Sequence, residues 1–132
     1  MNKILITGGL GYIGSHTVAE IVDINSKIII VDNLANSYLR IFRVLKELTN
    51  GEILFFNIDI RDRNQLEKII VEYKPNKVIH FASLKSVSDS SINPDLYYEN
   101  NVIGSKVLFD LIIKHKIKNI VFSSSATVYG EP

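Results

Sequence analysis

The sequence predicts an α/β fold, in which a doubly wound parallel sheet of about five strands carries helices on both faces. Two observations lead to this fold class. Short runs rich in Ile, Val and Phe recur along the chain, and most are apolar without interruption, as is typical of strands buried on both faces. Segments with the spacing of amphipathic helices alternate with these runs. Right-handed crossovers between such βα units predict the strand order 3-2-1-4-5.

The expected elements follow one another from the first residues on. We expect strands at residues 3–7, 27–32, 52–60, 77–83 and 119–125. Helices are expected at residues 15–24, where Val18 and Ile21 share a side, and at residues 63–73. The longest helix is expected from Pro94, which suits a first helical turn, to about residue 115. No linker or low-complexity segment interrupts the chain, so residues 1–132 are expected to form one domain.

Composition argues against several classes of partner. Fifteen Lys and Arg stand against 14 Asp and Glu, so no strong field is available to attract nucleic acid or an anionic membrane surface. The chain has no cysteine, which fits a cytoplasmic location and leaves no sulfur-based zinc site. Its three histidines are scattered, and His80, inside an expected strand, is interpreted as a packed, hydrogen-bonded residue. We expect no metal site and no membrane span.

Glycines cluster between the first expected strand and the first helix. Residues 9–14 satisfy G-x-G-x-x-G, and Gly8, Gly11 and Gly14 fit the wider G-x-x-G-x-x-G spacing. Such glycines allow a tight turn, the approach of a pyrophosphate to the amides of a helix N-terminus, and close packing of helix on strand. Asp32, at the end of the second strand, can accept both hydroxyls of an adenosine ribose and would repel the 2′-phosphate of NADP. The motif favours an NAD-binding, Rossmann-like domain over a structural turn with a capping Asp.

Six segments together resemble one family of proteins. They are TGGLGYIGSHT, VDNLANS, NIDIRD, HFASLKSV, PDLYYENNVIG and FSSSATVYG. With them the chain resembles the extended short-chain dehydrogenase/reductase superfamily, and specifically the UDP-glucose 4-epimerases, from Lys3 to Gly130. The resemblance implies the N-terminal, NAD-binding part of an enzyme that interconverts UDP-galactose and UDP-glucose. In that family the reaction passes through a 4-keto intermediate, with transient hydride transfer to NAD.

Related nucleotide-sugar 4,6-dehydratases resemble the chain in fold but typically carry an Asp-Glu pair where Ala126 and Thr127 stand here. Neither of these side chains transfers a proton near neutral pH, which favours the epimerase. Two alternatives remain open. One is another nucleotide-sugar epimerase or dehydratase, and the other is a non-catalytic NAD-binding module.

The resemblance also implies cofactor contacts by position. Tyr12 and Ile13 would supply amides to the pyrophosphate, and Asp59 and Ile60 would contact adenine from the end of the third strand. The residues expected around the adenosine ribose are Asp32, Asn33, Asn36 and Ser37. Those expected on the path to the nicotinamide ribose are Phe81, Ala82, Ser83 and Lys85. The set is completed by Gly8, Gly11, Gly14, Asn100 and Ser123.

Three members of this set keep a second interpretation. Ser83 stands where the family usually has glycine, so its Cβ and hydroxyl put close backbone approach in doubt. Asn100 could instead be an outward-facing polar residue of the long helix. Ser123 could be a small residue selected for tight packing.

Ser125 is the expected catalytic residue. As the third serine of its run, it matches the hydroxyl that in the family hydrogen-bonds the sugar O4 beside the catalytic tyrosine. Its alternative role is packing, with the hydroxyl bonded to a nearby carbonyl. The family's Tyr-x-x-x-Lys pair would lie beyond Pro132, as would the domain that holds the UDP-hexose substrate. We therefore expect the domain to be incomplete at its C-terminal end and the isolated chain to be inactive.

A homodimer or other self-association is also expected. The family usually dimerises through two long helices per subunit, and the long helix here would present Leu96, Ile103, Val107 and Leu111. The fifth strand would leave an open edge, which is a second surface for association.

Overall fold

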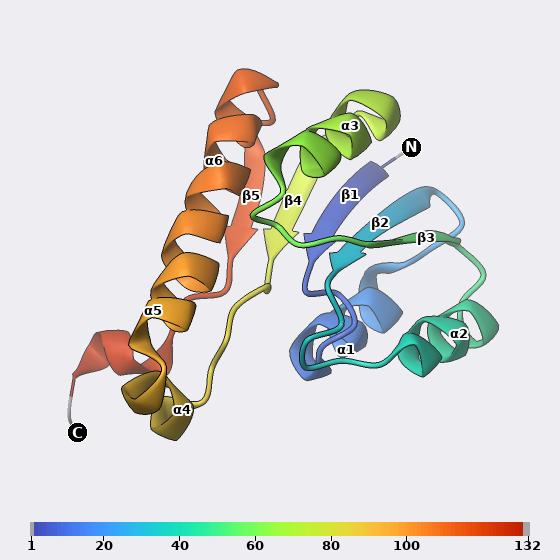
Figure 1. Cartoon of the computed structure of the whole chain (residues 1–132). Helices are drawn as coiled ribbons and strands as arrows, with labels where there is room; N and C mark the ends of the chain where they lie inside the picture. The colour runs from blue at the N-terminus through green and yellow to red at the C-terminus, as the bar shows by residue number, and fades with distance from the viewer. Residues whose placement is uncertain (1, 131–132) are drawn as a thin grey trace.

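The computed structural model describes residues 2–130, apart from the side chains of Val87, Ala126 and Thr127 (Figure 1). Its elements in chain order are β1 (Asn2–Thr7), α1 (Tyr12–Ile21), β2 (Ser26–Asp32), α2 (Leu39–Leu48), β3 (Glu52–Asn57), α3 (Arg63–Tyr73), β4 (Lys77–His80), α4 (Val87–Ile92), α5 (Pro94–Tyr97), η1 (Tyr98–Ile103), α6 (Gly104–Lys114), β5 (Asn119–Phe122) and η2 (Ala126–Tyr129). The segment η1 is π-helical, and η2 is a short 3-10 helix.

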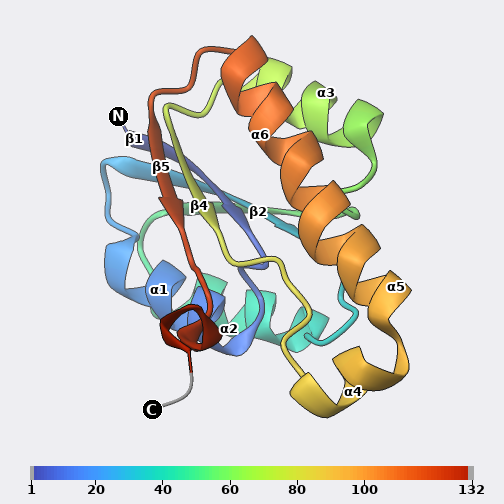
Figure 2. The same ribbon diagram turned by 90° about the vertical axis from the view of Figure 1, so that its left-hand side faces the viewer.

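The strands form one parallel, five-stranded sheet in the order β3-β2-β1-β4-β5, which confirms the predicted fold. Leu5 in β1 lies opposite Ile29 of β2 and Val78 of β4. The helices α1 and α2 lie on one side of the sheet and α3 and α6 on the other (Figures 1 and 2). The winding reverses between β1 and β4, so the connections that leave these two strands diverge at the carboxyl edge of the sheet.

Each face of the sheet carries its own apolar core. Neighbouring residues of β1 point to opposite faces, so that Leu5 packs with α3 and α6 while Ile4 and Ile6 pack with α1 and α2. This double burial is why the strands read as uninterrupted apolar runs. Leu111 of α6 is 0% exposed within the core under α3. The expectation that Leu111 belongs to an exposed dimerisation face is therefore wrong.

Three strands end earlier than predicted. β3 ends at Asn57 rather than at residue 60, because the Asp59 carboxylate accepts the backbone N–H of Arg61 at 2.9 Å and closes a turn. β4 ends at His80 because its neighbour β1 turns away at Gly8, whose φ is +69°. β5 ends opposite His80, at Phe122. Asp59, Ile60, Ser123 and Ser125 consequently lie in loops beyond the strands.

The helices agree better with the sequence pattern. α3 has its predicted bounds, and α1 begins at Tyr12, three residues before the predicted start at residue 15. The predicted long helix is present, with Pro94 in its first turn, but it consists of α5, the π-helical η1 and α6. Its middle turn is therefore wider than an α-helical turn.

Two α-helices were not predicted. α2 buries Leu45 and packs Ile41 and Phe42 against the same core, a helical spacing that is visible in the sequence. α4 is a short helix whose first turn is capped by the Ser86 hydroxyl, which accepts the Asp89 N–H at 3.2 Å. Between residues 2 and 130, no helix has both the length and the apolarity that crossing a bilayer requires.

β5 forms one edge of the sheet, as predicted. Its apolar side chains remain accessible, since Ile120, Val121 and Phe122 are 41%, 60% and 54% exposed. The β5 edge is therefore an apolar surface in this structure.

Candidate functional site

The glycine-rich turn brings the first strand, the first helix and the loop after β4 into close contact. Gly8 has a left-handed φ of +69°, and a Cβ at this position would lie 2.7 Å from the Ala82 nitrogen. A Cβ on Gly14, in the first turn of α1, would overlap the carbonyl oxygen of Gly8. Both positions therefore require glycine, one because of the backbone conformation and the other because the helix packs directly on the turn.

The N-terminus of α1 opens toward the carboxyl edge of the sheet. Its N-cap residue is Gly11, which has no side chain to accept a helical N–H, and no acidic residue lies in the first turn. The positive end of the helix dipole and the first amides are thus available to an anion. A hollow of about 600 Å³ lies against this helix end. It is lined by Gly8, Gly11, Tyr12, Ile13, Gly14, Asn36, Phe81, Ser83, Lys85, Ser86, Asp89 and Tyr97.

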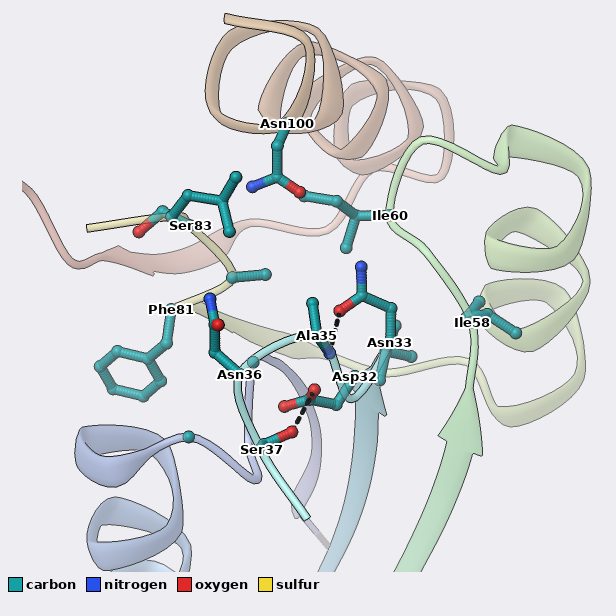
Figure 3. A pocket seen from close by; sticks show the side chains of 15 residues that line it. Asp32, Asn33, Ala35, Asn36, Ser37, Ile58, Ile60, Phe81, Ser83 and Asn100 are labelled. Atoms are coloured by element: carbon teal, nitrogen blue, oxygen red, sulfur yellow. Dashed lines mark hydrogen bonds between the residues drawn. The ribbon is translucent and has the colours of Figure 1, made fainter. Parts of the chain in front are cut away.

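A second, smaller hollow of about 90 Å³ adjoins the first, and Figure 3 shows the side chains around it. Its lining comprises Gly8, Gly11, Val31, Asp32, Asn33, Ala35, Asn36, Ser37, Ile58, Ile60, Phe81, Ala82, Ser83, Leu84 and Asn100. The two hollows share Gly8, Gly11, Asn36, Phe81 and Ser83. They form one groove along the carboxyl edge of the sheet, which we call the edge groove. It brings together most of the predicted cofactor residues.

Asp32 sits at the end of β2 with its carboxylate almost fully buried. Its Oδ2 accepts the Leu10 N–H at 3.0 Å, and its Oδ1 accepts the Leu34 N–H at 3.0 Å and the Ser37 hydroxyl at 2.8 Å. This carboxylate therefore holds the glycine-rich turn and the loop after β2 together, a structural role that sequence analysis did not predict. About four lone-pair sites belong to a carboxylate, so acceptor capacity toward the groove remains.

Asp59 does not line the edge groove, although its neighbours Ile58 and Ile60 do. Its Oδ1 accepts the backbone N–H and Nε of Arg61, and its Oδ2 accepts the second guanidinium nitrogen of Arg61 and the amide of Asn33, all at 2.8 to 3.0 Å. The Arg61 guanidinium, hydrogen-bonded to this carboxyl group, lowers the pKa of Asp59 to about 2. With four donors in place, the carboxylate must release one of them before it can accept from an adenine. That role stays a prediction.

Asn100 points from the long helix into the groove, as Figure 3 shows. It is 8% exposed, so the alternative of an outward-facing residue is wrong. Its Nδ2 donates to Oδ1 of Asn101 at 2.8 Å. Asn101 in turn accepts the Leu84 N–H at 2.8 Å and donates to the Leu84 carbonyl at 2.9 Å. Asn101 was missed in the sequence, where the one available signal was a pair of amides inside an apolar helix.

The loop after β4 forms one wall of both hollows. Phe81 and Ser83 line the two hollows, and Lys85 lines the larger one near Asp89 and Tyr97. The Ser83 side chain is therefore at the groove surface, at the position where the family usually has glycine. A cation at Lys85 is available to ribose or phosphate oxygens at that end of the groove.

Ser123 and Ser125 follow β5 and are not among the residues that line the two hollows. The Ser123 N–H donates to the His80 carbonyl at 3.1 Å and continues the sheet ladder, while the Ser125 carbonyl accepts the Val128 N–H at 3.2 Å. The structure thus places both serines at the carboxyl edge of β5 without bringing their side chains into the groove. Within residues 2–130, no three His, Asp or Glu side chains are grouped as metal ligands would be.

The strand order, the glycine-rich turn and the edge groove define a Rossmann-like α/β domain. Residues 5–132 match the family model described as GDP-mannose 4,6 dehydratase, and the chain belongs to this family. The chain is also 50% identical, over all 132 of its residues, to the UDP-glucose 4-epimerase of Neisseria meningitidis serogroup B, of which it spans 39%.

Solved structures of UDP-glucose 4-epimerases are similar throughout the chain. The protein from Bifidobacterium longum in complex with NAD+ and UDP matches 99% of this chain with a TM-score of 0.95 and 39% identity. The protein from Stenotrophomonas maltophila with bound NAD and formylated UDP-arabinopyranose matches 100% of it with a TM-score of 0.94 and 38% identity. In both cases this chain spans 39% of the other. The predicted resemblance to UDP-glucose 4-epimerases is thereby confirmed.

Proposed function

We propose that residues 1–132 form the NAD-binding domain of a UDP-glucose 4-epimerase. The observation that carries the proposal is the pairing of Asp32 with the uncapped N-terminus of α1 in a single groove. A buried carboxylate is suited to ribose hydroxyls, and free helix amides are suited to a pyrophosphate. A dinucleotide presents these two groups next to each other. The similar structures with bound NAD support the same ligand.

The remaining roles follow from positions in the edge groove. Tyr12 and Ile13 begin α1 and would offer backbone amides to the pyrophosphate. Asn36 and Ser37 lie beside Asp32 and would complete the adenosine ribose site, and Asn33 and Ile60 line the same hollow. Phe81, Ala82, Ser83, Lys85 and Asn100 would line the nicotinamide side. In this enzyme class NAD supplies a reversible hydride acceptor for the sugar.

NAD binding is tested by titration calorimetry of the purified chain with NAD and with NADP. NAD should bind, and NADP should bind at least tenfold more weakly, a difference of about 1.4 kcal/mol, because its 2′-phosphate would face the Asp32 carboxylate. The control variant is Asp23→Asn, which removes the charge of a loop carboxylate outside the groove lining. This variant should bind both dinucleotides as the unaltered chain does. Equal affinity of the unaltered chain for NAD and NADP contradicts the assignment.

A longer protein that contains this domain, like the relatives of which the chain spans 39%, would carry out the sugar chemistry, and UDP-hexose is the proposed substrate. Ser125 would contact the sugar, and the isolated 132-residue chain should show no epimerisation of UDP-galactose, because no Tyr-x-x-x-Lys pair follows Ser125 in it. The one such spacing in the sequence joins Tyr73, the last residue of α3, to Lys77, the first residue of β4, and both residues lie outside the groove lining. The family match makes a nucleotide-sugar dehydratase the second candidate. The side chains at 126 and 127, where such enzymes carry an acid and a base, lie outside the described residues. Products of the longer protein distinguish the two, since a dehydratase eliminates water and an epimerase does not.

Self-association and a cytoplasmic location are further parts of the proposal. The exposed apolar edge at β5 supports association, as do Leu96 and Val102 on the long helix, which are 47% and 48% exposed. Light scattering at increasing protein concentration tests it, and a constant monomer mass would contradict it. The near-neutral charge balance gives no support for a nucleic-acid partner.

A further inference from the structure

A buried row of hydrogen bonds runs through His80, behind the wall of the edge groove. His80 is 2% exposed at the end of β4. Its Nδ1 lies 2.6 Å from the Thr7 hydroxyl, and its Nε2 lies 2.8 Å from the Ser105 hydroxyl. Thr7 is the last residue of β1 and Ser105 belongs to α6, so the imidazole joins three elements.

The hydroxyl groups determine which nitrogen of His80 carries the proton. Ser105 donates its hydroxyl hydrogen to the Asn101 carbonyl at 2.6 Å, and it must therefore accept from the imidazole N–H at Nε2. Nδ1 is then an acceptor and receives the Thr7 hydroxyl hydrogen. The Thr7 oxygen is itself approached by the Ala82 N–H at 3.5 Å. Every donor in this row points the same way, from Ala82 to Asn101.

The surroundings of His80 keep it neutral. Its ring lies against Phe122 and Phe109, with centroids 5.5 Å and 5.9 Å apart. Burial, together with the positive charge of Lys85, lowers its pKa to about 4. Thr7, Ser105, Phe109 and Phe122, which contact the ring from β1, α6 and β5, carry no charge. His80 is therefore a fixed hydrogen-bond connector rather than an acid or a base.

Both ends of the row lead to the groove wall. At one end Ala82 packs on Gly8 of the glycine-rich turn. At the other end the side chain of Asn101 holds both backbone groups of Leu84 and orients the amide of Asn100. The hydrogen-bonded row therefore holds the loop at two residues, Ala82 and Leu84, and Ser83 lies between them.

We propose that His80, in its Nε2-protonated form, is a positioning residue for dinucleotide binding, which fixes the loop 81–84 and Asn100 in place before the ligand arrives. The inference rests on the proposed NAD-binding function. A positioning role for His80 differs from a merely structural role in one respect. A packing residue contributes to the free energy of unfolding alone, whereas a positioning residue also sets the affinity of the folded chain for its ligand.

The test removes the hydroxyl that bonds Nδ1 and leaves the imidazole in place. In Thr7→Val a methyl group replaces the hydroxyl, and in Thr7→Ser the hydroxyl is restored. Thr49→Val is the matched control, because the Thr49 hydroxyl donates to a carbonyl at the end of α2, away from the groove. The dissociation constant for NAD is measured by calorimetry, and urea unfolding establishes the conditions under which each variant is folded.

Thr7→Val should weaken NAD binding by the folded chain at least fivefold, Thr7→Ser should restore it to within twofold, and Thr49→Val should not change it. Nitrogen-15 shifts of the His80 imidazole should report a proton on Nε2 and none on Nδ1 at pH 7. A Thr7→Val variant of lower stability and unchanged NAD affinity would overturn the inference, as would a proton on Nδ1.

One further measurement separates this inference from the proposed function. If the unaltered chain binds no NAD, the proposed function fails, and with it the role of His80 in dinucleotide binding. The positioning of the loop is then judged by hydrogen exchange at the Leu84 amide, which should be at least tenfold faster in Thr7→Val than in Thr49→Val. Equal exchange rates would overturn the positioning role as well.

Discussion

Replacing Asp32 by Asn should destabilise the chain even without a ligand. The native carboxylate accepts from three donors, the Leu10 N–H on Oδ2 and the Leu34 N–H and Ser37 hydroxyl on Oδ1. An amide has one oxygen, and its best orientation leaves that oxygen with Leu34 and Ser37. The amide NH₂ then faces the N–H of Leu10, a residue that is 2% exposed.

A buried N–H without an acceptor costs about 1–3 kcal/mol, so we expect Asp32→Asn to lose about 2 kcal/mol of unfolding free energy. The opposite orientation of the amide would leave two donors without an acceptor and would cost more. Urea unfolding at pH 7, followed by circular dichroism, measures this difference.

Asp23→Asn is the matched control. Its Oδ1 accepts a single donor, the Asn25 N–H at 2.8 Å, and an amide oxygen can serve that donor equally well. The control should stay within about 0.5 kcal/mol of the unaltered chain. If Asp32→Asn is as stable as this control, then the three hydrogen bonds do not hold the glycine-rich turn to the β2 loop, and the reasoning is refuted.

Three further predictions concern pH, backbone conformation and the sheet edge. Burial lowers the pKa of His80 to about 4 from the usual value near 6.5, so between these values the unfolded chain binds a proton that the folded chain does not. The free energy of unfolding should therefore fall by about 1.6 kcal/mol as pH is lowered from 6.5 to 5, and urea midpoints independent of pH in this window would contradict the buried neutral imidazole. Gly8→Ala should lower the free energy of unfolding by about 3 kcal/mol, because the left-handed φ of Gly8 is combined with a Cβ placed 2.7 Å from the Ala82 nitrogen. Gly130→Ala, at φ +80° with no atom within 4 Å of the added Cβ, should lower it by only about 1–2 kcal/mol in the same urea assay. Equal costs for the two alanines would show that close packing is not the reason for Gly8. Val121→Lys, at a 60% exposed position of β5, should reduce self-association in light scattering and leave unfolding unchanged, and undiminished association would place the contact elsewhere.

The alternation of strands and helices could be predicted because both sides of the sheet are covered. Double burial makes β1 and β2 uninterrupted apolar runs, and it gives α3 a periodic apolar face with Leu66 and Ile70 at its centre. Asp32 could be located for a related reason, because the first polar residue after such a run marks the edge of the sheet.

The ends of the strands could not be predicted from apolar content. Ile58 and Ile60 continue the run of β3, but the chain has already turned there, since side-chain bonds of Asp59 and Asp62 compete with the sheet ladder. The sequence also did not reveal that both oxygens of Asp59 are already occupied by hydrogen-bond donors. Its main partner, Arg61, is only two residues away, and sequence alone does not show that the guanidinium folds back.

The role of Asn101 was hidden as well, because it depends on a contact with Leu84, seventeen residues earlier in the chain. The π-helical η1 was equally inaccessible. A helical pattern over this segment predicts which residues are apolar, but it does not reveal an extra residue accommodated within a turn.

That extra residue changes which side chains face the groove loop without changing the phase of the rest of the long helix. An α-helix advances by about 100° per residue, whereas the wider turn of η1 spreads one more residue over nearly the same rotation. Deleting one residue between positions 98 and 103 would therefore restore a regular α-helix and keep Leu108 of α6 in the core. The loss would fall on the wide turn itself, which places Asn100 in the groove and Asn101 on Leu84. The length of this segment thus determines the groove wall and not the packing of the core.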